Sequence, residues 1–140
     1  MTPEHKLRER LRKIAALFEG ASTDGERSAA AAAIERVRAT LAQLERTEWP
    51  EELQFSLPDR WRRRLFSALC RRYGLQPYRY KRQRHTTLML KVPRSFLDKT
   101  LWPEYLELKQ ALDEYLNEAT ERIIREEVFG DTQEAGERAG

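Results

Sequence analysis

Basic and aromatic residues are concentrated in the middle of this 140-residue sequence. Between Pro58 and Arg94, here called the basic segment, there are twelve bases and a single acid, Asp59, so its net charge is +11. Ten of these bases are arginines, whose planar guanidinium groups bind phosphates with two hydrogen bonds and stack on flat rings. Aromatic residues are interspersed among them, and unpaired bases stack on such rings while phosphates meet the cations. The pattern predicts a nucleic-acid-binding surface.

The candidate contacts fall into two clusters, one on a predicted helix and one on a predicted β-hairpin. We expect these residues to contact nucleic acid: Arg62, Arg63, Arg64, Arg71, Arg72, Tyr78, Arg79, Tyr80, Lys81, Arg82 and Arg84. The bases would bind phosphates, and a tyrosine would stack on a nucleobase. The sequence leaves open DNA or RNA, one strand or two, and the sequence preference. Such a protein would act as an accessory to a larger nuclease, transposase or polymerase.

The same charges allow two other interpretations. Residues 95–140 carry a net charge of −7, so acids of the C-terminal helix can neutralise the arginines within the chain. Alternatively, the protein is an adaptor whose basic middle docks on an acidic partner or on another copy of itself. Solvation alone does not require one base in every three residues over residues 58–94, so nucleic-acid binding is the favoured hypothesis.

Catalytic constellations are missing from the sequence, so we expect no enzyme, no cofactor and no metal. There is no glycine-rich phosphate loop. A metal-dependent nuclease needs two or three carboxylates in its basic cleft, whereas the basic segment offers only Asp59, with Asp98 and Glu104 beyond it. One cysteine and two histidines cannot complete a four-ligand zinc site or an internal disulfide. Cys70 is expected in the core and His85 at the surface.

The elements that must position these residues are mostly helical, which predicts an α+β class. Residues 4–19 have an amphipathic helical pattern, and residues 24–47 have a second, with a run of five alanines. The two should pack as an antiparallel helical hairpin over residues 4–47. Because Pro50 cannot continue a helix, residues 49–57 form a linker with a short extended piece at 53–55.

The basic segment itself should form a helix followed by a β-hairpin, over residues 58–92. Pro58 and Asp59 suit a first helical turn, and Gly74 suits a helix end. After it the apolar period changes to two, on both sides of a polar loop at 82–84. We expect the helix to bury Trp61, Leu65, Phe66, Leu69, Cys70 and Tyr73. The hairpin should direct Tyr78, Tyr80, Leu88, Leu90 and Val92 to the core, and Arg79, Lys81, Thr87, Met89 and Lys91 away from it.

A long helix should close the fold within residues 94–129. After a short connector, Pro103 suits its first turn, and apolar residues at spacings of three and four continue to about Val128. We expect this helix to be the spine of a single domain over residues 1–130. Residues 131–140 have no apolar anchor, which predicts a disordered tail.

Composition and the lengths of the apolar runs exclude three classes of protein. Apolar residues make up 40% of the chain, too many for a wholly disordered protein, and charged residues make up 35%. The longest apolar runs are too short to span a membrane, and the first residues lack the apolar core of a secretory signal. The sequence therefore predicts a cytoplasmic protein with no membrane partner.

Part of the sequence resembles the helical N-terminal module of a bacterial family of unknown function. The resemblance covers residues 7–44, through the segment 11–18, the turn 24–27 and the alanine run with Ile34. The tetrapeptide 72–75 is similar to a tyrosine-glycine-leucine element that ends such modules. It implies a bacterial or phage source, and it transfers neither a function nor a site residue.

Overall fold

The computed structural model describes residues 24–140, which contain two strands and several helical segments. In chain order these are α2 (Asp24–Thr47), β1 (Glu51–Ser56), α3 (Arg60–Arg72), β2 (Thr87–Val92), α4 (Arg94–Phe96), η1 (Leu97–Leu101), α5 (Trp102–Ile123) and η2 (Ile124–Val128). The predicted class is confirmed: the fold is mostly helical, with a two-stranded antiparallel sheet and a long C-terminal helix. The predicted helix at 4–19, and hence its hairpin with residues 24–47, lies outside the described residues.

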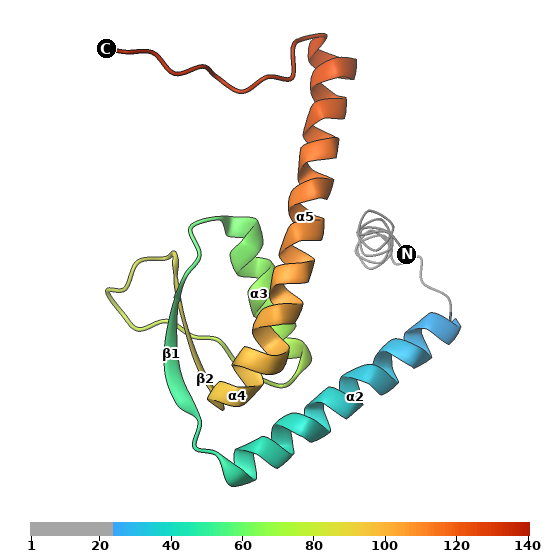
Figure 1. Cartoon of the computed structure of the whole chain (residues 1–140), viewed down its shortest axis with the longest axis vertical. Coiled ribbons are helices and arrows are strands. Elements are labelled where there is room, and N and C mark those ends of the chain that lie inside the picture. Colours follow the sequence, from blue (N-terminus) through green and yellow to red (C-terminus); the bar gives the residue numbers. More distant parts are fainter. Residues whose placement is uncertain (1–23) are drawn as a thin grey trace.

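The sheet, α3 and the start of α5 pack together, while α2 runs along one end and meets α4 (Figure 1). Four aromatic rings join three of these elements. The Phe66 ring of α3 lies 4.8 Å from Phe55 of β1 and 5.2 Å from Tyr105 of α5, and the Trp102 ring lies 5.0 Å from Tyr105. Phe66 and Tyr105 are almost fully buried. The packed rings therefore fix α3 against both the sheet and α5.

The partner of β2 differs from the prediction. β1 pairs with β2 in register from Glu51 opposite Val92 to Ser56 opposite Thr87, so residues 51–56 are a full strand rather than part of a linker. The segment before β2 contributes only one isolated bridge, between Tyr78 and Met89. β1 has the same two-residue alternation as the predicted hairpin arm, and nothing local in the sequence distinguishes the two pairings.

The faces of the sheet also correct the prediction. Because Tyr78 lies opposite Met89, its side chain is on the face opposite to the one that carries Leu88 and Leu90 into the core. Both Tyr78 and Tyr80 donate a hydrogen bond to Glu52 on β1, so they lie across the outer face of the sheet. Met89 is consequently buried at 6% exposure, although the alternation predicts it in solvent.

Helix α3 ends just before Gly74 as the sequence predicts, but it begins at Arg60, so Pro58 and Asp59 precede its first turn rather than form it. The Asp59 carboxylate caps the helix by accepting the Trp61 N–H at 2.7 Å. At the other end Gly74 has a φ of +80° and donates to the Arg71 carbonyl, while the Leu75 N–H reaches the Cys70 carbonyl. These two bonds form a Schellman motif, in which glycine is favoured.

The C-terminal helix extends to Val128, but only its first half contributes to the core. Its buried residues are Tyr105, Ala111 and Leu112, and the rest of the helix continues past the packed elements (Figure 1). Tyr115 and Ile123, both in the predicted apolar stripe, are 43% and 57% exposed. The prediction that this helix is the spine of the fold is therefore confirmed for its first three turns and wrong for the remainder.

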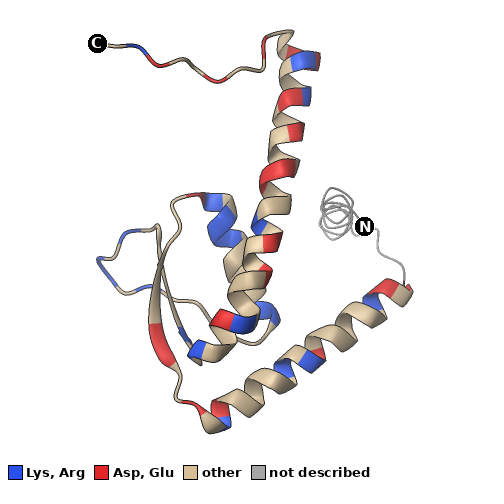
Figure 2. Cartoon of the chain, viewed as in Figure 1, with Lys and Arg blue, Asp and Glu red and all other residues tan. Residues whose placement is uncertain are grey.

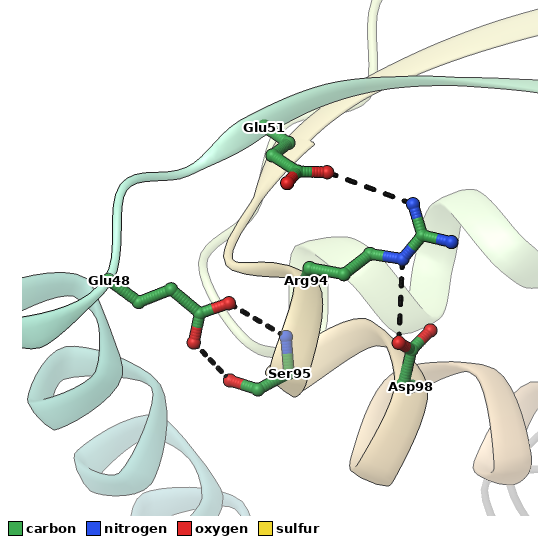
Figure 3. A network of polar contacts seen from close by, with 5 residues as sticks. All are labelled: Glu48, Glu51, Arg94, Ser95 and Asp98. Atoms are coloured by element: carbon green, nitrogen blue, oxygen red, sulfur yellow. Dashed lines mark hydrogen bonds and ion pairs between the residues drawn. The ribbon is translucent and has the colours of Figure 1, made fainter.

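A polar network ties the end of α2 and the start of β1 to the start of α4 (Figure 3). The Glu48 carboxylate accepts hydrogen bonds from the Ser95 N–H, at 3.0 Å, and from the Ser95 hydroxyl. Arg94 lies 3.7 Å from Glu51 and 3.4 Å from Asp98. Because the first N–H groups of a helix lack partners within it, Glu48 supplies a cap from a distant part of the chain.

We predict that Phe66→Ala lowers the free energy of unfolding by about 3–5 kcal/mol, because it leaves a cavity at the centre of the aromatic core. Urea denaturation measures the change. The control is Trp49→Ala, which removes a side chain that is 91% exposed and should shift stability by about 0.5 kcal/mol at most. Equal effects of the two substitutions would contradict the packing described above.

We predict that the contribution of Glu48 to stability disappears in acid. Its hydrogen bonds from Ser95 lower the pKa of Glu48 below the ordinary value of 4.5, so protonation weakens the folded state. A carboxylate with a lowered folded-state pKa stabilises the fold above its unfolded pKa and loses that effect as pH falls. Thermal unfolding of wild type and Glu48→Ala should therefore differ at pH 7 and converge at pH 3. Glu45→Ala, at an exposed position of α2, should show no such convergence.

Candidate nucleic-acid interface

Burial of one face of α3 determines which of its arginines are accessible. Phe66, Leu69 and Cys70 are almost fully buried, so the residues on the other side of the helix face outward. Among these, Arg64 and Arg71 are exposed and make no ion pair with another described residue. Figure 2 shows basic residues over α3 and over the loop that precedes β2, and acids along α5.

A groove of about 560 Å³ lies beside this outward side of α3. Its polar lining is dominated by four arginines, Arg63, Arg64, Arg71 and Arg79, and no acid lines it. The apolar lining comes from Trp61, Leu65 and Ala68 of α3, Pro77, Leu88 of β2 and Leu112 of α5, and Tyr78 also contributes. The structure thus brings five of the predicted site residues together in one concavity.

Two of the groove arginines are held by backbone carbonyls. The Arg63 guanidinium donates to the Leu57 and Pro58 carbonyls at 2.9 and 2.6 Å. Arg79 donates to the Thr87 carbonyl at 2.9 Å and to the His85 carbonyl. Carbonyl oxygens orient a guanidinium without neutralising its charge, so both cations stay available to an anion in a fixed position.

Two other predicted contacts are paired with acids of α5 and do not line the groove. Arg62 lies 2.9 Å from Asp113, whose hydrogen bond raises the pKa of the guanidinium further. Arg72 lies 3.8 Å from Glu104, which also accepts the hydroxyl of Tyr73. The acidic C-terminal helix therefore neutralises these two arginines, and they hold α3 against α5.

The loop before β2 carries three further predicted contacts at its tip. Lys81, Arg82 and Arg84 are all exposed, and none forms an ion pair with another residue in the range 24–140. The Tyr80 N–H donates to the side chain of Gln83 at 2.8 Å, which closes the turn. Arg82 has a φ of +72°, a backbone conformation that glycine adopts far more readily.

The two predicted tyrosines are engaged by a carboxylate. Tyr78 and Tyr80 both donate to the same oxygen of Glu52, and their rings lie edge to face with centroids 5.5 Å apart. The hydrogen bond to Glu52 is the main cause that raises the pKa of each hydroxyl, and it lowers the pKa of Glu52. The shared carboxylate and the edge-to-face contact hold both rings in place on the outer face of the sheet.

Trp61 is the residue at this site that sequence periodicity places wrongly. The apolar pattern predicts it on the buried side of α3, but it is 49% exposed and lines the groove. The Arg64 guanidinium lies 5.7 Å from the centre of its ring, within the distance of a cation–π contact. Its neighbours in sequence are arginines on both sides, and that signal could have indicated an outward position.

Other chemistry finds little support between residues 24 and 140. No group of three or more metal-ligating side chains is present in this range. Burial raises the pKa of the Cys70 thiol to about 12, so it stays protonated at neutral pH. None of the helices in this part of the chain has both the length and the apolar character to cross a membrane.

Comparison with known proteins identifies no relative: no family model, no curated protein sequence and no solved structure matches this chain. The resemblance of residues 7–44 to a bacterial helical module stays a prediction. Function must therefore be inferred from the geometry of the site alone.

We predict that Glu52→Ala lowers the titration midpoints of Tyr78 and Tyr80 toward the ordinary tyrosine value of 10, because the carboxylate that raises both is removed. Absorbance at alkaline pH follows tyrosine ionisation, and circular dichroism verifies that the protein remains folded. Glu51→Ala, which removes the neighbouring acid paired with Arg94, should leave both midpoints unchanged. Unchanged midpoints in Glu52→Ala would exclude the shared hydrogen bond.

Proposed function

We propose that this protein binds nucleic acid, without catalysing a reaction, through the groove beside α3 and the loop tip at 81–84. The observation that carries the proposal is the groove lining, which has four arginines and no acid. A concavity with one sign of charge concentrates the field that attracts a polyanion. The loop tip adds three more cations without acidic partners among the described residues.

The arginines divide into two groups under this proposal. Arg63 and Arg79 are oriented in advance by carbonyl oxygens, so binding a phosphate would immobilise little additional side chain. Arg64 and Arg71 would complete the phosphate contacts in the groove. Arg62 belongs to neither group. Its guanidinium is already paired with Asp113, so a phosphate would contribute less binding free energy there.

The proposed role is that of an accessory protein. The described residues contain no cluster of three or more metal-ligating side chains, which a metal-dependent nuclease would need, so we assign the surface a binding role. Such a protein would hold DNA or RNA for a larger protein that processes it.

One observation favours a second candidate function, an adaptor that binds another protein. Ile123 and Val128 near the end of the C-terminal helix, and Phe129 just after it, are 57%, 66% and 85% exposed. A protein partner could cover such exposed apolar side chains. In that case the basic groove would meet an acidic patch of the partner, or of a second copy of this chain.

We predict salt-dependent binding of labelled oligonucleotides, measured by fluorescence anisotropy with single-stranded DNA, duplex DNA and RNA. Contacts to about five phosphates give a slope of log K against log salt near −4.5 on duplex and −3.5 on single strands. Arg82→Ala/Arg84→Ala should make the slope shallower by about 1.8 on duplex or about 1.4 on single strands, because two phosphate contacts are lost.

The matched control is Arg36→Ala/Arg46→Ala, which removes the same charge from exposed positions on α2. It should leave the slope unchanged if the loop tip makes the contacts. Equal changes in both double variants would mean that only net charge matters. Absence of binding to all three nucleic acids at low salt would exclude the proposal and leave the adaptor.

A further inference from the structure

The groove beside α3 has an apolar lining that phosphate binding does not require. Leu65 and Ala68 of α3 form part of it, and Leu88 and Leu112 are buried residues that reach it from β2 and α5. Arginines alone would suffice to bind the backbone of a nucleic acid. A concavity with both arginines and apolar surface fits a ligand that is anionic at one end and flat and apolar at the other.

An unpaired nucleotide has this combination of surfaces, because its base is free to leave the strand while its phosphate stays on the backbone. A duplex keeps its bases stacked and paired inside, so it presents mainly phosphates to a concave protein surface. The groove volume of about 560 Å³ lies within the range of roughly 300–1,000 Å³ that is typical of ligand sites.

One aromatic side chain lies where a base would need it. Trp61 lines the groove and is half exposed, and tryptophan and tyrosine are the usual stacking surfaces for single-stranded nucleic acid. Tyr78 also contributes to the groove lining, but Glu52 holds its hydroxyl on the outer face of the sheet. The ring available to a ligand is therefore that of Trp61.

We infer that the groove binds an unpaired nucleotide of a single strand, with the base against Trp61 and the apolar lining and the phosphate on Arg64 and Arg71. This inference rests on the proposed function and narrows its ligand to single-stranded DNA or RNA. The strand continues toward the loop tip, because Arg79 lines the groove and Lys81, Arg82 and Arg84 follow it in the chain.

The test compares three labelled 12-nucleotide ligands at one salt concentration: oligothymidylate, an abasic strand with the same phosphates, and a 12-base-pair duplex. Oligothymidylate should bind at least about tenfold more tightly than the abasic strand, since base stacking on an aromatic ring contributes that much. Trp61→Ala should reduce oligothymidylate binding to the abasic level and leave abasic binding unchanged. Trp49→Ala removes an exposed tryptophan that does not line the groove and should change neither.

Tryptophan fluorescence gives a second readout that needs no alanine variant. In Trp49→Phe, whose remaining tryptophans are Trp61 and the partly buried Trp102, oligothymidylate should quench the emission and the abasic strand should not. This measurement keeps the inference testable if Trp61→Ala fails to fold. Quenching of equal size by both strands would overturn it.

The remaining outcomes separate this inference from the proposed function. Equal affinity for the abasic strand and oligothymidylate, or stronger binding of the duplex, would overturn the inference and leave nucleic-acid binding standing. Thymidine monophosphate that binds as tightly as the 12-mer would assign the groove to a free nucleotide instead. Equal binding of polyglutamate of the same length, or no binding of any nucleic acid, would overturn both and favour an acidic protein partner.

Discussion

The burial of one face of α3 is the constraint that determines the rest of the surface. Phe66 is enclosed by Phe55 from the sheet and by Tyr105 from α5, so the helix has only one rotation that fills the core. Every arginine on α3 then has a fixed direction. Arg63, Arg64 and Arg71 line the groove, whereas Arg62 forms an ion pair with Asp113 of α5. Packing of apolar rings thus decides where the positive charges are.

Acids neutralise the arginines to different degrees on the two sides of α3. Near α5 the arginines are balanced by acids, as in the pair of Arg72 and Glu104, and these pairs join elements of the fold. On the far side of α3, Arg63 and Arg79 bond to carbonyls and Arg64 lies beside the Trp61 ring, so no acid among the described residues neutralises their charge. The basic segment therefore holds α3 against α5 through some of its arginines, and under the proposed function its other arginines present charge to a ligand.

Local sequence patterns predict the described helices, but they do not predict which strands pair across a long stretch of sequence. The span of α2, the Asp59 cap and the Gly74 end of α3 follow from propensity and capping rules that act within a few residues. The pairing of β1 with β2 joins residues more than thirty positions apart. The alternating segment with Tyr78 and Tyr80 is closer to β2 in the sequence, so the pattern predicts it as the partner strand instead. The groove is equally nonlocal, because Leu88 and Leu112 reach it from separate elements. Sequence reasoning found its arginines but not its apolar lining.

Arg82 has a left-handed backbone conformation, so at this position the side chain that is present lowers the stability of the fold. A residue with a Cβ atom costs about 1–2 kcal/mol in this conformation, whereas glycine adopts it freely. Selection for stability alone would therefore place glycine at the turn, as in most tight turns. The arginine therefore keeps a cation at the exposed loop tip at the expense of backbone strain. Replacing Arg82 with glycine would relieve that strain and remove the cation in the same step.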